Sequence, residues 1–376
     1  MKIYSIAAIA CLGIFVAACT PADDQRDPYL ILISIDGFGW RLQDTNDTPG
    51  LDRIAAAGVR AKAMRPAYPS LTFPNHYSIA TGLYPYQHGI VDNEFPNADR
   101  SAWYNAWDRN SVEDGSWYGG EPIWVSAEKS GMTSAAFFFV GTEAPVAGYP
   151  PTYWYKFDAA IPGETRVKKA LEWLTLPEDK RPHIITLYFE HVDTASHDYG
   201  PDSFETELAV EQVDGYLLQL LDGIEKLDIR DDISLVVVSD HGQAAYQTES
   251  DAFVIEDNVD LEGLIIFDHG SLVNIYVEPY DRARAEQVRD AINDHWEHGQ
   301  AYLREESPQR WRLHNDPKFA DVIVLADPTY RVVADRSRSL RDFGGDHGCV
   351  SRGSSWFPFV SMLSGNDNPS ISIISG

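Results

Sequence analysis

Four long apolar runs recur along the chain, and they constrain its fold more than any other feature. The runs cover residues 29–35, 133–140, 183–190 and 233–240. They are predominantly apolar rather than alternating, which is typical of central parallel strands that are covered on both faces. Segments with the apolar spacing of helices lie between them, at residues 48–57, 164–174 and 204–226. The alternation predicts an α/β fold: a doubly wound, mostly parallel sheet flanked by helices.

Carboxylates follow three of these predicted strands. Asp36 comes directly after the first run, Asp240 ends the fourth, and Asp193 lies three residues beyond the end of the third at Glu190. Ligand sites in open α/β sheets form at the carboxyl ends of the strands. We therefore expect the three aspartates to meet at one rim of the sheet.

Histidines accompany these carboxylates. His197 follows Asp193 by four residues, so the two share a helical face and can bind one ion. His241 is adjacent to Asp240, and a Gly-Asp-His-Gly segment adds His347. Mixed Asp/His sets suit zinc, whereas all-oxygen sets suit Mg²⁺ or Ca²⁺. Each pair alone is a weak signal, but their combination at successive strand ends predicts a metal site.

Thr72 stands before Phe73 and Pro74, and a proline in the first turn marks the start of a helix. Thr72 near the N-cap has two interpretations. It can be only a helix cap. It can also be a nucleophile, because a helix N-terminus favours anionic charge and a metal ion can lower the pKa of a hydroxyl.

A long signature surrounds Thr72. Residues 69–76 read Pro-Ser-Leu-Thr-Phe-Pro-Asn-His, and the pattern continues through Thr-Gly-Leu-Tyr-Pro at 81–85 to His-Gly-Ile-Val-Asp-Asn at 88–93. From Leu30 to about His347 the chain resembles the nucleotide pyrophosphatase/phosphodiesterases (type I phosphodiesterases) of the alkaline-phosphatase superfamily. The resemblance implies an alkaline-phosphatase-like fold. It also implies an enzyme that hydrolyses phosphodiester or pyrophosphate bonds of nucleotides or similar small molecules.

The resemblance further implies two Zn²⁺ per chain. The ligands it assigns are Asp36, Thr72, Asp240 and His241 for one zinc, and Asp193, His197 and His347 for the other. Three aspartates and two Zn²⁺ leave a net charge of about +1, which a monoanionic phosphodiester balances. No Lys or Arg lies within the Thr72 motif to favour a dianionic monoester.

The same resemblance assigns the remaining roles. Thr72 attacks phosphorus and forms a phosphothreonine ester that water then hydrolyses. Asn93 resembles the oxyanion-binding amide and acts with the backbone N–H of Phe73. Phe73 and Phe157 resemble the aromatics that stack on a nucleobase, although position 157 is more usually Tyr. A core position is the alternative for both rings.

The composition and the Thr72 motif together exclude some binding partners and some enzyme classes. The formal charge is −27, from 30 basic and 57 acidic residues, so binding to a nucleic-acid polymer is not expected. A sulfatase would need Cys or Ser at position 72 and Arg at position 76, where this chain has Thr72 and His76. Three alternatives stay open: a lysophospholipid/glycerophosphodiester phosphodiesterase, a phosphonoacetate-type hydrolase, and an inactive surface lipoprotein that binds ligands.

The N-terminus predicts export. After Lys2 an apolar stretch covers residues 3–16 and ends in Val-Ala-Ala-Cys, which resembles a bacterial lipobox. We expect a signal peptide at 1–19 with lipidated Cys19, and a tether at 20–27. Thr20, rather than Asp, after the cysteine favours the periplasmic face of the outer membrane of a Gram-negative cell. An ordinary signal peptide is the alternative.

The rest of the chain divides into three parts. Residues 28–242 are predicted to form the phosphodiesterase core and 243–341 an α+β insertion packed on it. Residues 342–376 end the core with the last metal ligand and an atypical tail. After Gly348 the sequence departs from the Tyr and Asn-containing loop of the family, as expected of an altered reading frame, a truncation or a divergent terminus.

Overall fold

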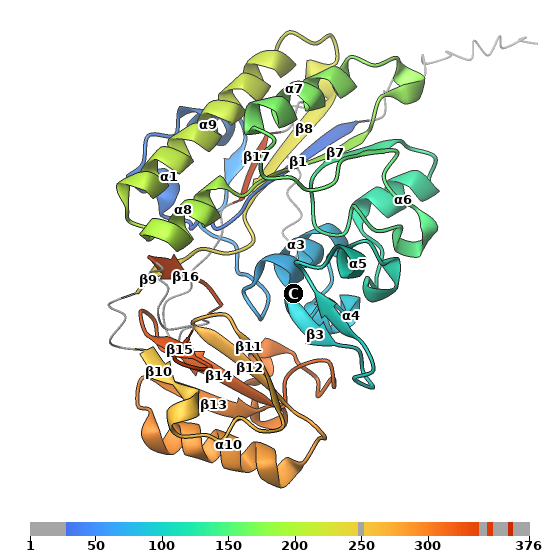
Figure 1. Ribbon diagram of the computed structural model, residues 1–376. Helices are drawn as coiled ribbons and strands as arrows, with labels where there is room; N and C mark the ends of the chain where they lie inside the picture. The colour runs from blue at the N-terminus through green and yellow to red at the C-terminus, as the bar shows by residue number, and fades with distance from the viewer. Residues whose placement is uncertain (1–27, 247–251, 338–343, 349–359, 364–376) are drawn as a thin grey trace, which may run out of the picture.

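A computed structural model describes residues 28–246, 252–337, 344–348 and 360–363. These residues form two lobes, an upper one built on a large sheet and a lower one built on a smaller sheet (Figure 1). Cys19, Cys349 and most of the atypical tail lie outside the described residues.

The large sheet has seven strands. In spatial order they are β2 (Val59–Arg60), β17 (Val360–Leu363), β8 (Ile233–Val238), β1 (Tyr29–Ile35), β7 (Ile184–Phe189), β5 (Ser134–Phe137) and β6 (Tyr153–Trp154). Neighbouring strands from β8 to β6 pair parallel, and β17 pairs antiparallel with β8 and β2. The predicted mostly parallel α/β sheet is therefore confirmed. The predicted strand at 133–140 is shorter than expected, since Phe138 already has a left-handed φ of 66°.

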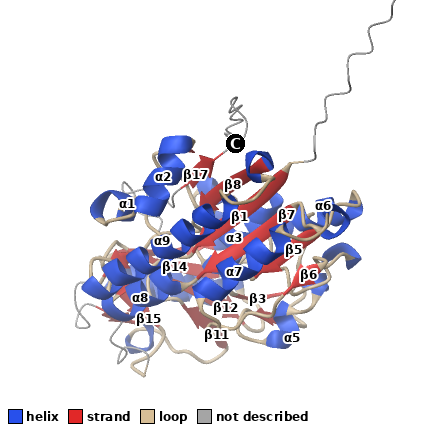
Figure 2. Ribbon diagram, turned by 90° about the horizontal axis from the view of Figure 1, so that it is seen from above, coloured by secondary structure: helices blue, strands red, loops and turns tan. Residues whose placement is uncertain are grey.

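Helices cover both faces of this sheet. The α-helices of the upper lobe and its flank are α1 (Leu42–Thr45), α2 (Pro49–Ala57), α3 (Thr72–Thr81), α4 (Pro85–His88), α5 (Arg109–Val112), α6 (Ile123–Lys129), α7 (Gly163–Leu174), α8 (His191–Tyr199) and α9 (Phe204–Ile224). Figure 2 shows α7 and α9 lying along the strands of the large sheet. The three helices predicted from apolar spacing correspond to α2, α7 and α9.

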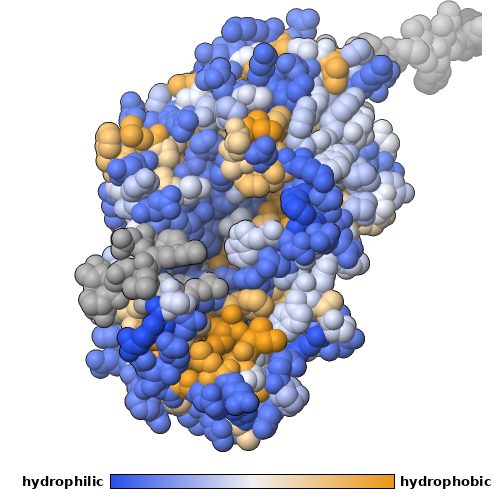
Figure 3. Space-filling view, in the orientation of Figure 1, coloured by the Kyte–Doolittle hydropathy of each residue, from blue (hydrophilic) through white to orange (hydrophobic). Residues whose placement is uncertain are grey.

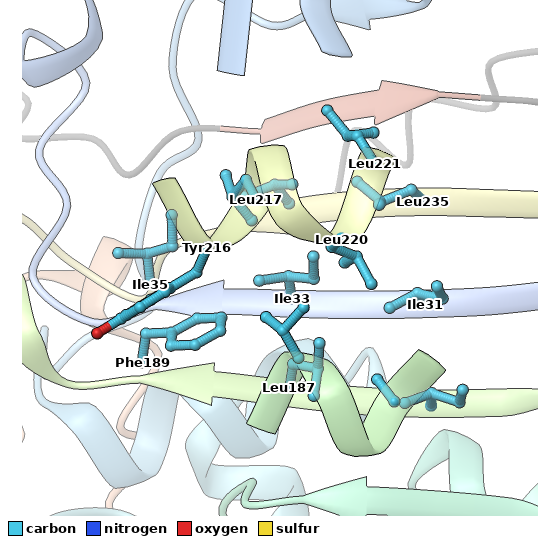
Figure 4. Packing of buried hydrophobic residues seen from close by; sticks show 14 of the residues in the cluster. Ile31, Ile33, Ile35, Leu187, Phe189, Tyr216, Leu217, Leu220, Leu221 and Leu235 are labelled. Atoms are coloured by element: carbon cyan, nitrogen blue, oxygen red, sulfur yellow. The ribbon is translucent and has the colours of Figure 1, made fainter. Parts of the chain in front are cut away.

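The continuous apolar run of β1 serves two cores at once. Ile31, Ile33 and Ile35 point to the side where α9 packs, and Figure 4 shows them among Leu187 of β7 and Leu217 of α9. Leu32 belongs to the core on the opposite face. Because successive side chains of a strand alternate between faces, a strand that is buried on both sides reads as an unbroken apolar run.

The lower lobe is an antiparallel sheet with one long helix. Its strands, in spatial order, are β11 (Leu264–Asp268), β12 (Leu272–Val277), β14 (Val322–Ala326) and β13 (Gly299–Leu303), and its helix is α10 (Arg282–His295). The side chains of Ala285, Val288 and Ile292 bury α10 against the sheet. Figure 3 shows an apolar area on this lobe, whereas most of the same face of the molecule is hydrophilic.

The described residues also form three short strand pairs outside the two larger sheets. They are β3 (Glu94–Pro96) with β4 (Trp103–Asn105), β9 (Ala244–Ala245) with β16 (Gly345–Asp346), and β10 (Ala252–Val254) with β15 (Arg331–Val333). Tyr276 and Ile323 of the lower sheet share a core with Leu32 and Val238 of the large one. None of the helices in the described part of the chain is long and apolar enough to span a bilayer.

Candidate active site

The first candidate group lies where the two central strands end. Ile35 pairs with Phe189 of β7, and Ser34 pairs with Val238 of β8, so the three strands stop at one level. Asp36 follows β1, and Asp240 and His241 follow β8. We call these three residues the first cluster; their side chains are almost completely buried. The rim predicted from the sequence is therefore present.

The atoms of the first cluster converge with the Thr72 hydroxyl. His241 Nε2 lies 3.0 Å from Asp240 Oδ2, 3.4 Å from Asp36 Oδ1 and 3.3 Å from Thr72 Oγ1. Ligand bonds of about 2.0–2.1 Å in a tetrahedral zinc site place neighbouring ligand atoms about 3.3–3.4 Å apart. Asp36 Oδ1 is buried and has no hydrogen-bond partner among the described residues. The geometry thus fits a divalent ion held by these four side chains.

The electrostatics of the first cluster also favour a cation. Burial, and then the nearby carboxylates of Asp240 and Asp193, raise the pKa of Asp36 well above its ordinary value. Burial would also raise the pKa of Asp240, but His241 and His76 outweigh it and hold that pKa well below the ordinary range. A bound divalent ion would relieve the repulsion among the carboxylates.

The second cluster consists of Asp193, His197 and His347. Asp193 and His197 lie on one face of α8, with Asp193 Oδ1 3.5 Å from His197 Nε2. His347 comes from the short segment after β16, and its ring stacks on His241 with the centroids 3.6 Å apart. The structure therefore brings all seven predicted ligands into the two predicted groups. Their binding of metal stays a prediction.

Both histidines of the second cluster are oriented by main-chain carbonyls. His347 Nδ1 lies 2.9 Å from the Ser70 carbonyl, and His197 Nδ1 lies 3.1 Å from the Gly345 carbonyl. Since a carbonyl only accepts, each Nδ1 carries the proton and each Nε2 keeps a lone pair for an ion. Burial, followed by the neighbouring His241 and His197, lowers the pKa of His347, which keeps its ring neutral.

Thr72 is the first residue of α3, and Leu71 occupies the N-cap position. Thr72 is thus inside the helix rather than its cap, which removes the purely structural interpretation of its hydroxyl as a capping group. The Phe73 N–H donates a hydrogen bond of 3.0 Å to Asn93 Oδ1. This bond brings the predicted pair together but engages the Phe73 N–H, predicted to bind an anion beside Asn93, so that the Asn93 amide NH₂ is the donor left for an anion.

The two predicted stacking aromatics lie near the clusters. Phe73 is half-buried and meets Tyr104 edge-on, with the ring centroids 6.2 Å apart. Phe157 is 43% exposed, and its ring lies 5.9 Å from that of Tyr188. The Tyr188 hydroxyl donates to Asp36 Oδ2 at 2.5 Å, which places Phe157 beside the first cluster.

A cavity of about 430 Å³ opens from the second cluster towards the lower lobe. Its walls mix polar and apolar surface and come from both lobes: Leu71, Asn93, Glu94, Trp107, His197, Asp268, His269, Gly270, Arg331, Val333, Asp346 and His347. Arg331 is the one guanidinium among these walls, against the three carboxylates of Glu94, Asp268 and Asp346. The cavity has room for a substrate group beside the second cluster.

Sequence reasoning missed the residues that hold the predicted ligands in place. Tyr188 supports Asp36, and Gln243 Nε2 donates to Asp193 Oδ1 at 2.6 Å. Ser34 and His76 lie behind Asp240. A signal existed for Ser34, which is the polar residue within the apolar run 29–35, and for His76, which lies in the signature. Nothing in the sequence singled out Tyr188 or Gln243.

The fold and the site together define a mainly parallel α/β protein with two Asp/His groups near the strand ends. The threonine that begins α3 lies against one of these groups. The family model described as type I phosphodiesterase / nucleotide pyrophosphatase matches residues 30–349. The chain belongs to this family.

Relatives agree with this assignment. Human ectonucleotide pyrophosphatase/phosphodiesterase family member 1 is 31% identical over 344 residues, which cover 87% of this chain and 36% of that protein. Venom phosphodiesterase CdcPDE of Crotalus durissus collilineatus is 32% identical over 346 residues, which cover 87% of this chain and 40% of that protein. The chain therefore spans about two fifths of the length of these relatives.

Solved structures show the same fold. Human ectonucleotide pyrophosphatase/phosphodiesterase 5 superposes with a TM-score of 0.82 at 25% identity, covering 89% of this chain and 88% of that one. An inactive variant of the murine protein, solved in complex with AMP, superposes with a TM-score of 0.82 at 24% identity, covering 90% of this chain and 88% of that one.

Proposed function

We propose that this chain hydrolyses phosphodiester or pyrophosphate bonds of nucleotides or similar small molecules, with Thr72 as the nucleophile. One observation carries the proposal. The Thr72 hydroxyl stands at the start of α3, 3.3 Å from Nε2 of His241 in the first cluster, and His347 of the second cluster stacks on the same His241 ring. The family assignment supports the same reaction class.

Two divalent ions, which we propose are Zn²⁺, would be held by the first cluster with Thr72 and by the second cluster. When bound they would supply Lewis-acid stabilisation of the attacking and leaving oxygens and would lower the pKa of a hydroxyl or water. The Asp/His donor set, and the spacing of 3.0–3.4 Å among the atoms of the first cluster, support zinc.

The protein's own groups orient the reaction. The helix start presents Thr72 Oγ1, and Asn93 donates its amide N–H groups to the oxygens on which charge develops. Thr72 Oγ1 bonds to phosphorus as one ester oxygen leaves, and water then cleaves the phosphothreonine ester and returns the hydroxyl. The cavity beside the second cluster would receive one of the two groups carried by the phosphorus.

A diester is favoured over a monoester. The cavity contains Arg331, the cation that the Thr72 motif lacks, but its three carboxylates outnumber that charge. The surroundings therefore do not add the net positive charge that a dianionic monoester needs. We expect bis(p-nitrophenyl) phosphate to be turned over faster than p-nitrophenyl phosphate.

The test is hydrolysis of bis(p-nitrophenyl) phosphate by the full chain, with chelation and Zn²⁺ add-back. Activity should disappear with chelator and return with Zn²⁺. Thr72→Ala should lower kcat on the order of a thousandfold or more, because the nucleophile is gone. Thr81→Ala, at the other end of α3, is the matched control and should keep wild-type kcat. Full diesterase activity in Thr72→Ala would show that the nucleophile assignment is wrong.

The substrate class needs a second comparison. The names of the relatives, and the AMP bound to the murine neighbour, make a nucleotide the first choice. Turnover of a nucleotide 5′-aryl ester should exceed that of a choline phosphodiester or of phosphonoacetate. The reverse order would favour the lipid-headgroup or phosphonate alternatives. A protein that binds no metal ions and turns over none of these substrates would favour an inactive ligand-binding lipoprotein.

We also propose that the protein is exported and anchored through lipidated Cys19 at the outer membrane. The lipobox-like Val-Ala-Ala-Cys at 16–19 supports this proposal. Metabolic labelling with a fatty-acid analogue should mark the wild-type protein and not Cys19→Ser. Equal labelling of both would point to an ordinary signal peptide or another modification site.

A further inference from the structure

His76 is buried directly behind the first cluster. It lies one helical turn after Thr72 on α3, and its side chain is completely inaccessible to solvent. Nδ1 is 2.9 Å from the Thr72 carbonyl oxygen and 3.2 Å from Asp240 Oδ2. Nε2 is 2.8 Å from Ser34 Oγ. One imidazole therefore touches the helix of the nucleophile, a carboxylate of the first cluster and the central strand.

The neighbours of His76 fix the position of its proton. Both atoms near Nδ1 are acceptors, the Thr72 carbonyl and the Asp240 carboxylate, so Nδ1 must carry the hydrogen. In the neutral ring Nε2 is then an acceptor, and the Ser34 hydroxyl donates to it. Ser34 interrupts the apolar run of β1 on the same face as Leu32, where a hydroxyl with no partner would be costly to bury.

Aromatic rings hold the plane of this imidazole. Phe139 lies 5.3 Å and Tyr188 lies 5.2 Å from the His76 ring, both edge-on at 77°. Tyr188 is itself bonded to Asp36. The two carboxylates of the first cluster are thus supported from behind by adjoining side chains, His76 for Asp240 and Tyr188 for Asp36.

We propose that His76 is a positioning residue: its Nδ1–H bonds the Thr72 carbonyl in the first turn of α3, and the same nitrogen lies 3.2 Å from Asp240 Oδ2, so that the ring fixes this turn relative to the Asp240 carboxylate. Asp240 and Thr72 then keep the geometry with His241 that an ion needs. His76 does not touch substrate or the reacting atoms. This inference rests on the proposed metal site and nucleophile, and adds a residue that contacts both through one ring nitrogen.

His88 provides a matched comparison in the same part of the chain. It is also completely buried, its Nε2 also contacts a serine hydroxyl, Ser78 Oγ at 2.9 Å, and its ring also meets an aromatic, Tyr77 at 5.0 Å. Its Nδ1, however, accepts from the backbone N–H of Ile90 at 3.2 Å, whereas His76 Nδ1 bonds the Thr72 carbonyl and lies beside a carboxylate. Substituting His88 measures the cost of losing a buried histidine alone.

The experiment compares His76→Leu, His76→Asn and His88→Leu in the full chain. Co²⁺ is titrated into the metal-free proteins while its visible absorption band is followed, and a chelator competition gives the affinity of each site without turnover. Because partners of ligating groups typically contribute 10- to 100-fold in metal affinity, His76→Leu should weaken one of the two sites by about that factor. Asn can place an N–H near the position of Nδ1, so His76→Asn should recover most of the affinity.

Kinetics provide the second readout. With bis(p-nitrophenyl) phosphate and saturating Zn²⁺, His76→Leu should lower kcat by about 10- to 100-fold and change KM much less, because substrate contacts are unaltered. Ser34→Ala, which removes only the partner of Nε2, should lie between wild type and His76→Leu. His88→Leu should match wild type in Co²⁺ affinity and kcat.

Three outcomes would overturn the proposal: wild-type Co²⁺ affinity in His76→Leu, an equal loss in His88→Leu, or no recovery in His76→Asn. If His76→Leu does not fold, the Co²⁺ affinity and kcat of His76→Asn and Ser34→Ala, compared with wild type, decide whether the proposal holds. A wild-type protein that neither binds Co²⁺ nor cleaves the diester would refute the proposed function itself. An active wild type with unaffected His76 variants would refute only this inference.

Discussion

The first and second clusters contain the same residue types, but the protein supports them in different ways. The first cluster sits at the ends of two neighbouring central strands and is almost fully buried. The second takes Asp193 and His197 from α8, where both side chains stay partly exposed, and His347 from the short segment at 344–348. The ends of the sheet strands set the first, whereas the second exists only when α8 and the distant segment 344–348 meet.

The position of His347 depends on contacts with other parts of the chain. Its ring is oriented by the Ser70 carbonyl, next to the Ser70–Gly348 bridge. Its own carbonyl accepts from the Ser271 hydroxyl of the lower lobe at 2.5 Å. We infer that an ion in the second cluster is held less tightly and exchanges sooner, because its ligands are less buried and depend on the packing of two lobes.

The largest expected effect comes from removing one ligand of each cluster. Asp240→Asn should lower kcat on the order of a thousandfold and should abolish metal binding at the first cluster, because it removes a buried predicted ligand that lies 3.0 Å from His241 Nε2. Asp193→Asn should lower kcat strongly as well, yet keep the ion of the first cluster. Metal analysis of the purified variants checks this. Loss of both ions from Asp193→Asn would show that the clusters are not independent.

Stepwise chelation should separate the clusters in the unmodified protein. With increasing chelator the ion of the second cluster should leave first, and its apparent affinity should be at least about tenfold weaker. Residual metal content, measured alongside activity, should fall from two ions to one before it reaches zero. If both ions left together in a single step, the two clusters would not differ in metal affinity as their different burial and packing predict.

Substitutions of the residues that bond the predicted ligands should also weaken metal binding more at the first cluster than at the second. Tyr188→Phe removes the bond to Asp36, and it should weaken metal binding at the first cluster by about tenfold, near the value of a buried hydrogen bond to a charged group. Gln243→Leu removes the bond to Asp193 and should weaken the second cluster by less, since water can reach that site. Co²⁺ affinities of both variants test this ranking, and a larger effect of Gln243→Leu would reverse it.

The smallest effect concerns the junction with the lower lobe. Ser271→Ala removes the hydroxyl that bonds the His347 carbonyl, which typically contributes about 1 kcal/mol. It should weaken only the second cluster, by less than about tenfold, and leave the first unchanged. Ser78→Ala, near His88 and remote from both clusters, is the control. An equal change in affinity at both clusters would show that Ser271 acts through general stability.

The sequence predicted the main sheet well because its strands are buried on both faces. Such strands leave an unbroken apolar signal, and β1, β7 and β8 correspond closely to three of the predicted runs. Local geometry limited the prediction at β5, where a left-handed Phe138 ends the strand inside the apolar run. The same physics grouped Asp36, Asp193 and Asp240, because parallel strands end at one rim.

What the sequence by itself determined is the set of residue types that can ligate a metal and their position near the strand ends, since that information is local. The tertiary structure decided which groups stand behind them. Ser34 meets His76, Tyr188 meets Asp36 and Gln243 meets Asp193 across separations of 42, 152 and 50 residues. The tertiary structure also forms the cavity, because residues of both lobes line its walls. Such contacts depend on how whole elements pack against each other, and no spacing along a single chain encodes that relation.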